Sequence, residues 1–309
     1  MPAGWHIDGP WVAEVSDGEI VPWVATPACI GLSGPEWCVL GTRARGEAVL
    51  DAGAPDELPE AGIVEGLEDR LRPGWVDAPA LAALLAGRYT RLPTPDDRPF
   101  AFESRVGLEI DDTTRTAEQA NLYFRKAVRL GRNDGVAGLY ASLGTPAGTG
   151  LPADALTTGH LRIGRRGRPL ALAKPPPLSA AWRDIVAGAH LGAIEPADGD
   201  LFWLVLASPV SLPDPPTTGT PVRPRLPALR GCHADVVAAV HLPPVVLGGL
   251  DLATRRSKPN RAFLMPGSAW GIRLRGGSPL DRRLALYALH HQCTLGPVSD
   301  RPFGFGRTW

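Results

Sequence analysis

The stretch over residues 99–124 constrains the fold of this chain more than any other. Its first part alternates polar and apolar side chains well enough to predict a strand over 99–110. The charge-dense run 111–115 (Asp-Asp-Thr-Thr-Arg) ends that strand, and an apolar triplet then opens a run over 122–130 that could be a strand or a short helix. Charge also divides the chain here. Residues 1–112 hold 20 Asp and Glu against 8 Lys and Arg, whereas residues 113–309 hold 12 against 24.

This charge division bears on the class of partner. The whole chain has a formal net charge of zero, yet its two parts carry −12 and +12. A polyanion responds to the local field of a protein rather than to its total charge. The basic part is therefore a candidate nucleic-acid binder, although charge could also segregate by chance or to keep the surface soluble.

Glycine and proline interrupt the pattern throughout, with 36 Gly and 33 Pro in 309 residues. That content predicts many short strands and long loops. We expect a hairpin over 11–24 that turns at Asp17-Gly18. The expected helices span 77–87, 179–189 and 279 to about 292, and Asp77, Ser179 and Ser278 are their expected N-caps. Strands and helices do not alternate regularly, so an α+β fold is favoured over a doubly wound parallel sheet.

The remaining segments suggest two domains. The Gly/Pro/Thr-rich loop 144–155 is the expected boundary, giving domains over 1–150 and 151–309. We expect a flexible insertion over 51–62 and exposed loops over 211–230 and 255–261. The other expected strands cover 37–40, 136–143, 201–207, 236–241, 245–250, 262–265 and 269–274.

Targeting and cysteine patterns favour a reduced, cytoplasmic protein. No run of 18 apolar residues and no secretory signal pattern is present. The four cysteines, at 29, 38, 232 and 293, fit no zinc or disulfide framework. We expect no cofactor and no membrane partner.

Three basic segments are candidate RNA contacts. In the glycine-rich segments 164–168 and 304–307 the backbone can approach a phosphate closely while arginine supplies positive charge. In the basic loop 255–261 the cations can contact RNA phosphates while bases stack on nearby aromatic residues. Ordinary tight turns with solvated arginines are the alternative, as is a core role for Phe263 and Trp270. The predicted RNA-contacting residues are Arg162, Arg165, Arg166, Arg168, Arg255, Arg256, Lys258, Arg261 and Arg307, and the predicted loop glycines are Gly164, Gly167, Gly267, Gly304 and Gly306.

Catalytic and metal-binding signals are weak. His290 and Cys293 have the i, i+3 spacing of zinc ligands, but no second matched pair is evident, so we predict no metal. His160, beside a basic run, could serve a metal-independent nuclease. The acids at 109, 111 and 112 could hold Mg²⁺, but a solvated turn, or pairing with Arg105 and Arg115, is the favoured interpretation. We therefore predict no catalytic residue.

Several motifs in order resemble the third subunit of the type III-B CRISPR Cmr effector complex, a family of the RAMP superfamily. The central signature is carried by 103–111 (Glu-Ser-Arg-Val-Gly-Leu-Glu-Ile-Asp), 114–117 (Thr-Arg-Thr-Ala) and 121–124 (Asn-Leu-Tyr-Phe). Residues 161–168 resemble the family's Gly-Gly-x-Gly-Arg segment, and 258–271 its Pro-Ala-Gly-Ser strand. Residues 304–306 (Gly-Phe-Gly) resemble the superfamily's glycine-rich loop.

The resemblance implies a fold and a role. It implies tandem ferredoxin-like (RRM-like) domains and a non-catalytic subunit for antiviral defence. That subunit would hold the 5′ repeat-derived tag of the CRISPR RNA and contact the large polymerase-like subunit and a backbone subunit. An endoribonuclease that matures CRISPR RNA, with His160 as its general acid–base, is the alternative, and a scaffold that touches no RNA is a third.

The chain also departs from the family pattern. Members usually begin with a strand carrying an Asp-Gly-Arg-Pro-Phe-like motif and a glycine-containing helix, so we expect the first domain to be N-terminally truncated. Such a sheet would expose strand edges. Arg165 stands where the family usually has glycine, which should narrow the loop's access to positive φ.

Overall fold

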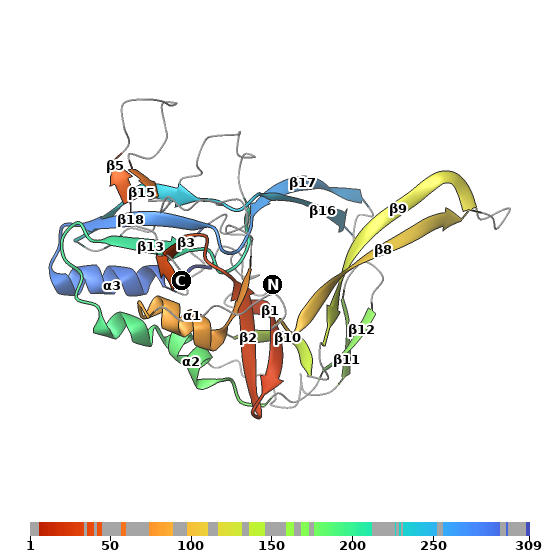
Figure 1. Cartoon of the computed structure of the whole chain (residues 1–309), viewed down its shortest axis with the longest axis horizontal. Helices are drawn as coiled ribbons and strands as arrows, with labels where there is room; N and C mark the ends of the chain where they lie inside the picture. The colour runs from red at the N-terminus through yellow and green to blue at the C-terminus, as the bar shows by residue number, and fades with distance from the viewer. Residues whose placement is uncertain are drawn as a thin grey trace.

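In the described part of the chain, the computed structural model combines several small antiparallel sheets with three short α-helices (Figure 1). The expected α+β class agrees with this architecture, whereas the tandem ferredoxin-like arrangement and the boundary near residue 150 stay predictions. The structure describes residues 6–33, 36–39, 42–44, 57–59, 74–88, 98–110, 117–131, 136–145, 159–163, 168–172, 176–211, 226, 229, 231–251, 256–290, 295 and 307–309.

A four-stranded sheet of order β10-β1-β2-β7 forms the first layer. It consists of β1 (His6–Ser16), β2 (Glu19–Ala25), β7 (Trp75–Asp77) and β10 (Ala137–Gly144). The hairpin β1–β2 turns at Asp17 and Gly18, which have φ values of 51° and 75°. Positive φ at both central residues suits a tight hairpin turn, so this prediction is confirmed.

A three-stranded sheet of order β13-β18-β15 forms a second layer. Its strands are β13 (Leu201–Val205), β15 (His233–Val240) and β18 (Ala269–Arg275). A separate sheet of order β14-β17-β16 is formed by β14 (Val210–Ser211), β16 (Val245–Asp251) and β17 (Arg256–Leu264). The expected loop over 255–261 is therefore wrong, because residues 256–261 belong to strand β17.

The other described strands form four two-stranded pairs. The longest joins β8 (Phe100–Ile110) to β9 (Ala117–Leu130), so the run over 122–130 is a strand and not a helix. The second pairs β11 (Gly159–Ile163) with β12 (Arg168–Leu172). The shorter ones are β3 (Ile30–Ser33) with β4 (Glu36–Val39), and β5 (Thr42–Ala44) with β6 (Glu57–Pro59). Residues 57–59 thus pair inside the expected insertion over 51–62, whose other residues lie outside the described part.

The helices begin where the caps predict. In α1 (Ala78–Leu85) the Asp77 carboxylate accepts a hydrogen bond from the Ala80 N–H, and in α2 (Ala180–Ala187) the Ser179 hydroxyl accepts one from Trp182. A 3₁₀ turn, η2 (Ala189–Ala193), follows α2. In α3 (Pro279–Leu289), Ser278 forms a capping box with Asp281. This helix ends at Leu289, about one turn before the expected end. None of the described helices is long and apolar enough to cross a membrane.

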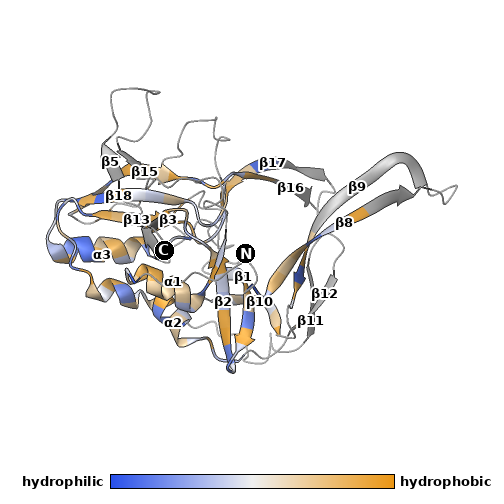
Figure 2. Ribbon diagram, viewed as in Figure 1, coloured by the Kyte–Doolittle hydropathy of each residue, from blue (hydrophilic) through white to orange (hydrophobic). Residues whose placement is uncertain are grey.

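One hydrophobic core draws on both ends of the chain. It contains Trp11 and Val24 from the first sheet, Leu81 from α1, Trp182 from α2, and Trp309. The Trp182 ring meets those of Trp11 and Trp309 edge to face, at centroid distances of 5.0 and 5.6 Å. In Figure 2 hydrophobic residues colour much of β1, β2 and α1. The segments before and after residue 150 are therefore packed against each other.

Candidate nucleic-acid interface

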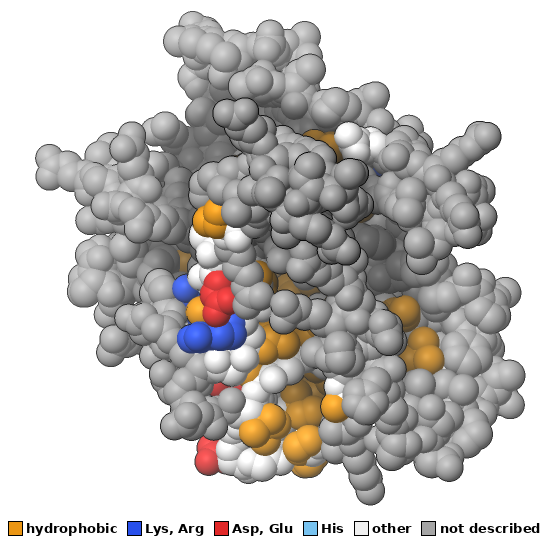
Figure 3. All heavy atoms as spheres, turned by 90° about the vertical axis from the view of Figure 1, so that its right-hand side faces the viewer, with side chains coloured by type: hydrophobic (Ala, Val, Ile, Leu, Met, Phe, Trp, Pro, Cys, Tyr) orange, Lys and Arg blue, Asp and Glu red, His pale blue; other side chains and the backbone are white. Residues whose placement is uncertain are grey.

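The three hairpins that carry most of the predicted RNA contacts, or lie beside them, occupy the same side of the molecule. In Figure 1 the pairs β8–β9, β11–β12 and β16–β17 lie to the right of the first sheet, and the three helices lie to the left. Figure 3 faces this side and shows a group of Lys, Arg, Asp and Glu side chains above a hydrophobic area among the described atoms. The strands that carry most of the predicted contacts thus lie on the other side of the first sheet from the helices.

The register of β11–β12 separates two of the predicted arginines. Arg168 pairs with Ile163, and Arg162 pairs with Pro169. Because cross-strand partners share a face and successive residues alternate, Arg162 and Arg168 lie on opposite faces of the hairpin. His160 shares the face of Arg162. The connecting residues 164–167, which include Gly164, Arg165, Arg166 and Gly167, lie outside the described part.

Strand β17 arranges the second basic segment. Arg256 pairs with Asp251 and Lys258 with Gly249, so these two cations lie on one face of the strand. The register shifts between Leu247 and Gly249, where β17 carries one extra residue around Pro259. A bulge accommodates a proline that a regular ladder would exclude. Arg255 lies outside the described residues.

Arg261 lies beyond the bulge and contacts the protein itself. Its Nη2 donates a hydrogen bond of 2.6 Å to the Ser211 hydroxyl. The guanidinium carbon also lies 5.4 Å from the centre of the Phe263 ring. Phe263 and Trp270 are buried, so the core interpretation of these two aromatics is confirmed. Arg261 is exposed but is already held in place by β14.

The structure places Arg307 in the interior, which argues against its predicted RNA contact. Its Nε lies 2.6 Å from the Asp8 Oδ1, and the two side chains are 7% and 11% exposed. The Arg307 N–H also donates to the Ser208 hydroxyl, and its carbonyl accepts from the Ala207 N–H. A phosphate could reach this guanidinium only by breaking a buried ion pair. Gly304 and Gly306 lie outside the described part.

Gly267 is a packing residue of the turn between β17 and β18. Its φ is +94°, and a Cβ there would lie 2.7 Å from the Thr26 carbonyl oxygen. The Gly267 carbonyl accepts a hydrogen bond from the Ala28 N–H. The neighbouring Ser268 hydroxyl is fully buried and accepts from the Leu242 N–H. This segment therefore joins the second sheet to the chain after β2.

Replacing Gly267 with alanine is expected to lower the free energy of unfolding by about 3 kcal/mol or more, because the methyl group adds a steric overlap to backbone strain of about 1–2 kcal/mol. Gly199→Ala is the matched control. Gly199 has a φ of +82°, and no atom lies within 4 Å of the position that a Cβ would take, so only the strain applies. Urea denaturation of both variants would measure the difference, and equal losses would contradict the overlap.

The β8–β9 hairpin carries an ion pair on one face and a pair of exposed apolar side chains on the other. Glu103 and Arg129 form an ion pair of 3.4 Å between side chains that are 29% and 61% exposed. On the other face Phe102 pairs with Val128, and both are more than half exposed. Arg98 lies over the Phe100 and Phe102 rings, at 5.4 and 5.8 Å. The acids at 111 and 112 and Arg115 lie outside the described residues, as does the Arg105 side chain.

Packing explains the positions of His241 and His290. The His290 Nε2 lies 2.6 Å from the Ile185 carbonyl oxygen, in a buried position. Burial lowers the pKa of His241 to about 4, and its ring lies edge-on to Trp270. Among the described residues no group of three His, Cys, Asp or Glu could hold a metal. Cys293 lies outside that part of the chain, and the His160 side chain is not described.

Comparison with known proteins identifies one family. The model of the family described as CRISPR-associated protein (Cas_Cmr3) matches residues 1–308. A solved structure described as "Cryo-EM structure of the Type III-B Cmr-beta bound to cognate target RNA" is 14% identical, covers 95% of this chain and 77% of that chain, and has a TM-score of 0.42. A second solved structure, of the same complex with target RNA and AMPPnP, is 13% identical, covers 87% of this chain and 67% of that chain, and has a TM-score of 0.38. The curated proteins gave no match. Both TM-scores are below 0.5, so only the family match supports an assignment.

Proposed function

The chain belongs to the Cas_Cmr3 family of CRISPR-associated proteins, and from that membership we propose that it is a non-catalytic subunit of a type III-B RNA-guided effector complex. The observation that carries the proposal is the match of the family model to residues 1–308. The subunit binds the 5′ tag of the CRISPR RNA. It also bridges the large polymerase-like subunit to a backbone subunit, as part of antiviral defence.

The proposed RNA interface consists of the β11–β12 hairpin and the start of strand β17. Arg162 and Arg168 lie in β11 and β12, and Arg256 and Lys258 lie at the start of β17, while Arg165, Arg166 and Arg255 are next to these strands in the sequence. The net charge of +12 over residues 113–309 supports a polyanionic ligand. Arg261 is expected to contribute less to RNA binding, because its guanidinium group already donates a hydrogen bond to Ser211 and lies over the Phe263 ring. We omit Arg307 because it is buried.

Protein partners are assigned to other surfaces. Residues 1–112 carry a net charge of −12, which suits contact with proteins better than with RNA. The exposed apolar face of β8–β9, with Phe102 and Val128, suits a partner subunit because large exposed apolar patches mark interaction sites. A scaffold that never touches RNA is the third possibility, and crosslinking within a reconstituted complex would separate it from an RNA-binding subunit.

Incubating the protein with precursor CRISPR RNA in EDTA is expected to leave the RNA intact while the tag-bearing RNA is bound. The reason is that the proposal assigns no catalytic residue to the chain, so neither a metal nor a general acid–base is expected to cleave the RNA. Denaturing gels and a filter-binding assay would measure both outcomes. Specific cleavage that His160→Ala abolishes, with His233→Ala as an exposed-histidine control, would establish the nuclease alternative instead.

A further inference from the structure

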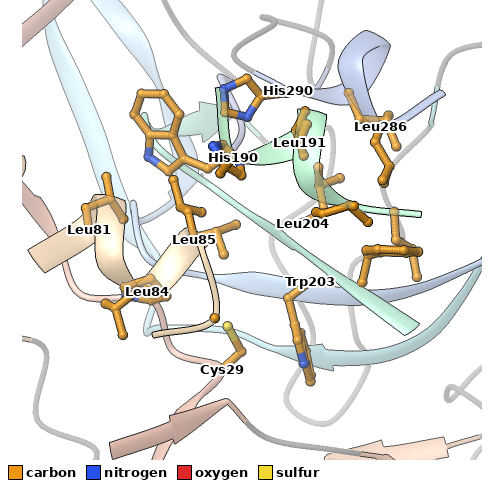
Figure 4. Close-up of a pocket in the computed structure, with 18 of the residues that line it drawn as sticks. Cys29, Leu81, Leu84, Leu85, His190, Leu191, Trp203, Leu204, Leu286 and His290 are labelled. Atoms are coloured by element: carbon orange, nitrogen blue, oxygen red, sulfur yellow. The ribbon is translucent and has the colours of Figure 1, made fainter. Parts of the chain in front are cut away.

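A cavity of about 340 Å³ lies between the helices and the second sheet. Figure 4 shows Leu81, Leu84 and Leu85 of α1 on one side, and Leu204 of β13 and Leu286 of α3 on the other. None of the described residues that line it is Lys, Arg, Asp or Glu. The Cys29 thiol in its wall is buried, and burial raises its pKa to about 12, so this group stays protonated and uncharged. The cavity is therefore an apolar compartment.

The volume of this cavity favours an occupant. Protein interiors are packed as densely as organic crystals, and the destabilisation caused by a void grows with its volume. An apolar cavity of about 150 Å³ already stays dry and binds benzene or xenon. This cavity is more than twice that size and is partly open to the surface, so an apolar molecule can enter it and gain contacts with a wall that is otherwise only partly covered.

Aromatic rings and one polar group define the chemistry at one end of the cavity. The rings of His190 and His290 meet edge to face with centroids 4.9 Å apart, and the Trp309 ring lies 5.9 Å from that of His290. The Nε2 of His290 is already engaged by the Ile185 carbonyl. His190 is half-buried, and burial lowers its pKa, so its imidazole is neutral at pH 7. It can exchange one hydrogen bond with a neutral ligand but offers no charge to an ion.

We propose that this cavity binds a small, neutral aromatic molecule, with its ring among the leucines of α1 and β13 and a polar atom beside His190. Edge-to-face contact with the rings of His290 and Trp309 favours an aromatic over a purely aliphatic ligand. The cavity is separate from the β11–β12 hairpin and from β17. Ligand binding in the cavity would therefore be a further function that does not depend on RNA binding.

Indole and indene test the proposal on the full-length protein, because they have the same shape but only indole carries an N–H donor. Calorimetry and thermal melting should show one saturable site and a ligand-dependent rise in Tm. Indole should bind about fivefold more tightly, since a net hydrogen bond is worth roughly that factor. In His190→Phe the two affinities should become equal. Failure of both probes to bind saturably would overturn the proposal and would leave the cavity to an apolar segment of a partner polypeptide.

Filling the cavity provides an independent check. Leu85→Trp places a large ring at the half-buried end of α1, so it should abolish indole binding. Leu280→Trp is the matched control, because Leu280 is 62% exposed on α3 and does not line the cavity. If Leu85→Trp does not fold, Leu84→Met, which changes the wall without adding a ring, should shift the indole affinity severalfold. Unchanged indole binding in a folded cavity variant would place the ligand elsewhere and overturn the assignment. RNA affinity should be the same in all these variants, which separates this test from that of the proposed function.

Discussion

Replacing Arg307 with methionine is expected to lower the free energy of unfolding by about 3–5 kcal/mol. The substitution leaves the Asp8 carboxylate, 11% exposed, without the guanidinium that lies 2.6 Å away. An uncompensated buried charge costs far more than the net gain of the original pair. Asp8 lies in β1 and Arg307 beside β13, so the loss also loosens the contact between the two ends of the chain. Urea denaturation monitored by tryptophan fluorescence would measure the change.

Two control variants distinguish the effect of a buried ion pair from that of an ion pair nearer the surface. The double variant Asp8→Leu/Arg307→Met removes both charges and should recover most of the lost stability, because apolar replacements of a buried pair are often neutral. Arg129→Met breaks the pair with Glu103 and should cost at most about 1 kcal/mol. RNA affinity of Arg307→Met, measured well below its Tm, should equal that of the native protein. Lost RNA affinity without lost stability would return Arg307 to the RNA interface.

Replacing Arg165, Arg166 and Arg168 together with alanine is expected to weaken binding of tag-bearing RNA by about 100-fold at 0.1 M salt. Each phosphate contact to a single strand contributes about −0.7 to the slope of log affinity against log salt, so the slope should become less steep by about 2. Filter binding across a series of salt concentrations would measure both quantities. An unchanged affinity and slope would show that the β11–β12 hairpin does not contact RNA.

The matched control for charge is Arg88→Ala/Arg183→Ala/Arg275→Ala. These three exposed arginines lie in or beside α1, α2 and β18, and their removal changes the net charge by the same amount. A purely long-range effect of net charge would weaken RNA binding equally in both triple variants. A contact effect would weaken it strongly only in the hairpin variant. Circular dichroism and thermal melting should confirm that both remain folded.

Local chemistry was enough to predict the elements whose ends are set by neighbouring residues. The Asp17-Gly18 turn fixes the β1–β2 hairpin, because few residue pairs tolerate positive φ at both positions. Asp77, Ser179 and Ser278 begin the helices for a similar reason, since each side chain satisfies a backbone N–H within three residues. The signature over 103–124 likewise indicated the family that the family-model match confirms.

The segment 255–261 shows where local chemistry fails. Its arginines, lysine and proline are typical of an exposed loop. Residues 256–258 and 261 nevertheless pair with β16, and farther along β17 Phe263 pairs with Ser211 of β14. Ladder hydrogen bonds to strands that are distant in sequence stabilise it as a strand, and the bulge near Pro259 removes the proline from the ladder. Propensity within a short window carries no information about such partners.

The sequence by itself determined the family, the α+β class, the helix starts and the basic character of the second part, because these depend on composition and on residues close together in the chain. Only the tertiary structure decided how the candidate side chains are used. It buried Arg307 against Asp8, 299 positions away, placed Arg162 and Arg168 on opposite faces of one hairpin, and formed a partly open apolar cavity between α1, α3 and β13. A charge that is exposed and one that is buried look the same in a sequence, since burial is set by the distant elements that pack around it.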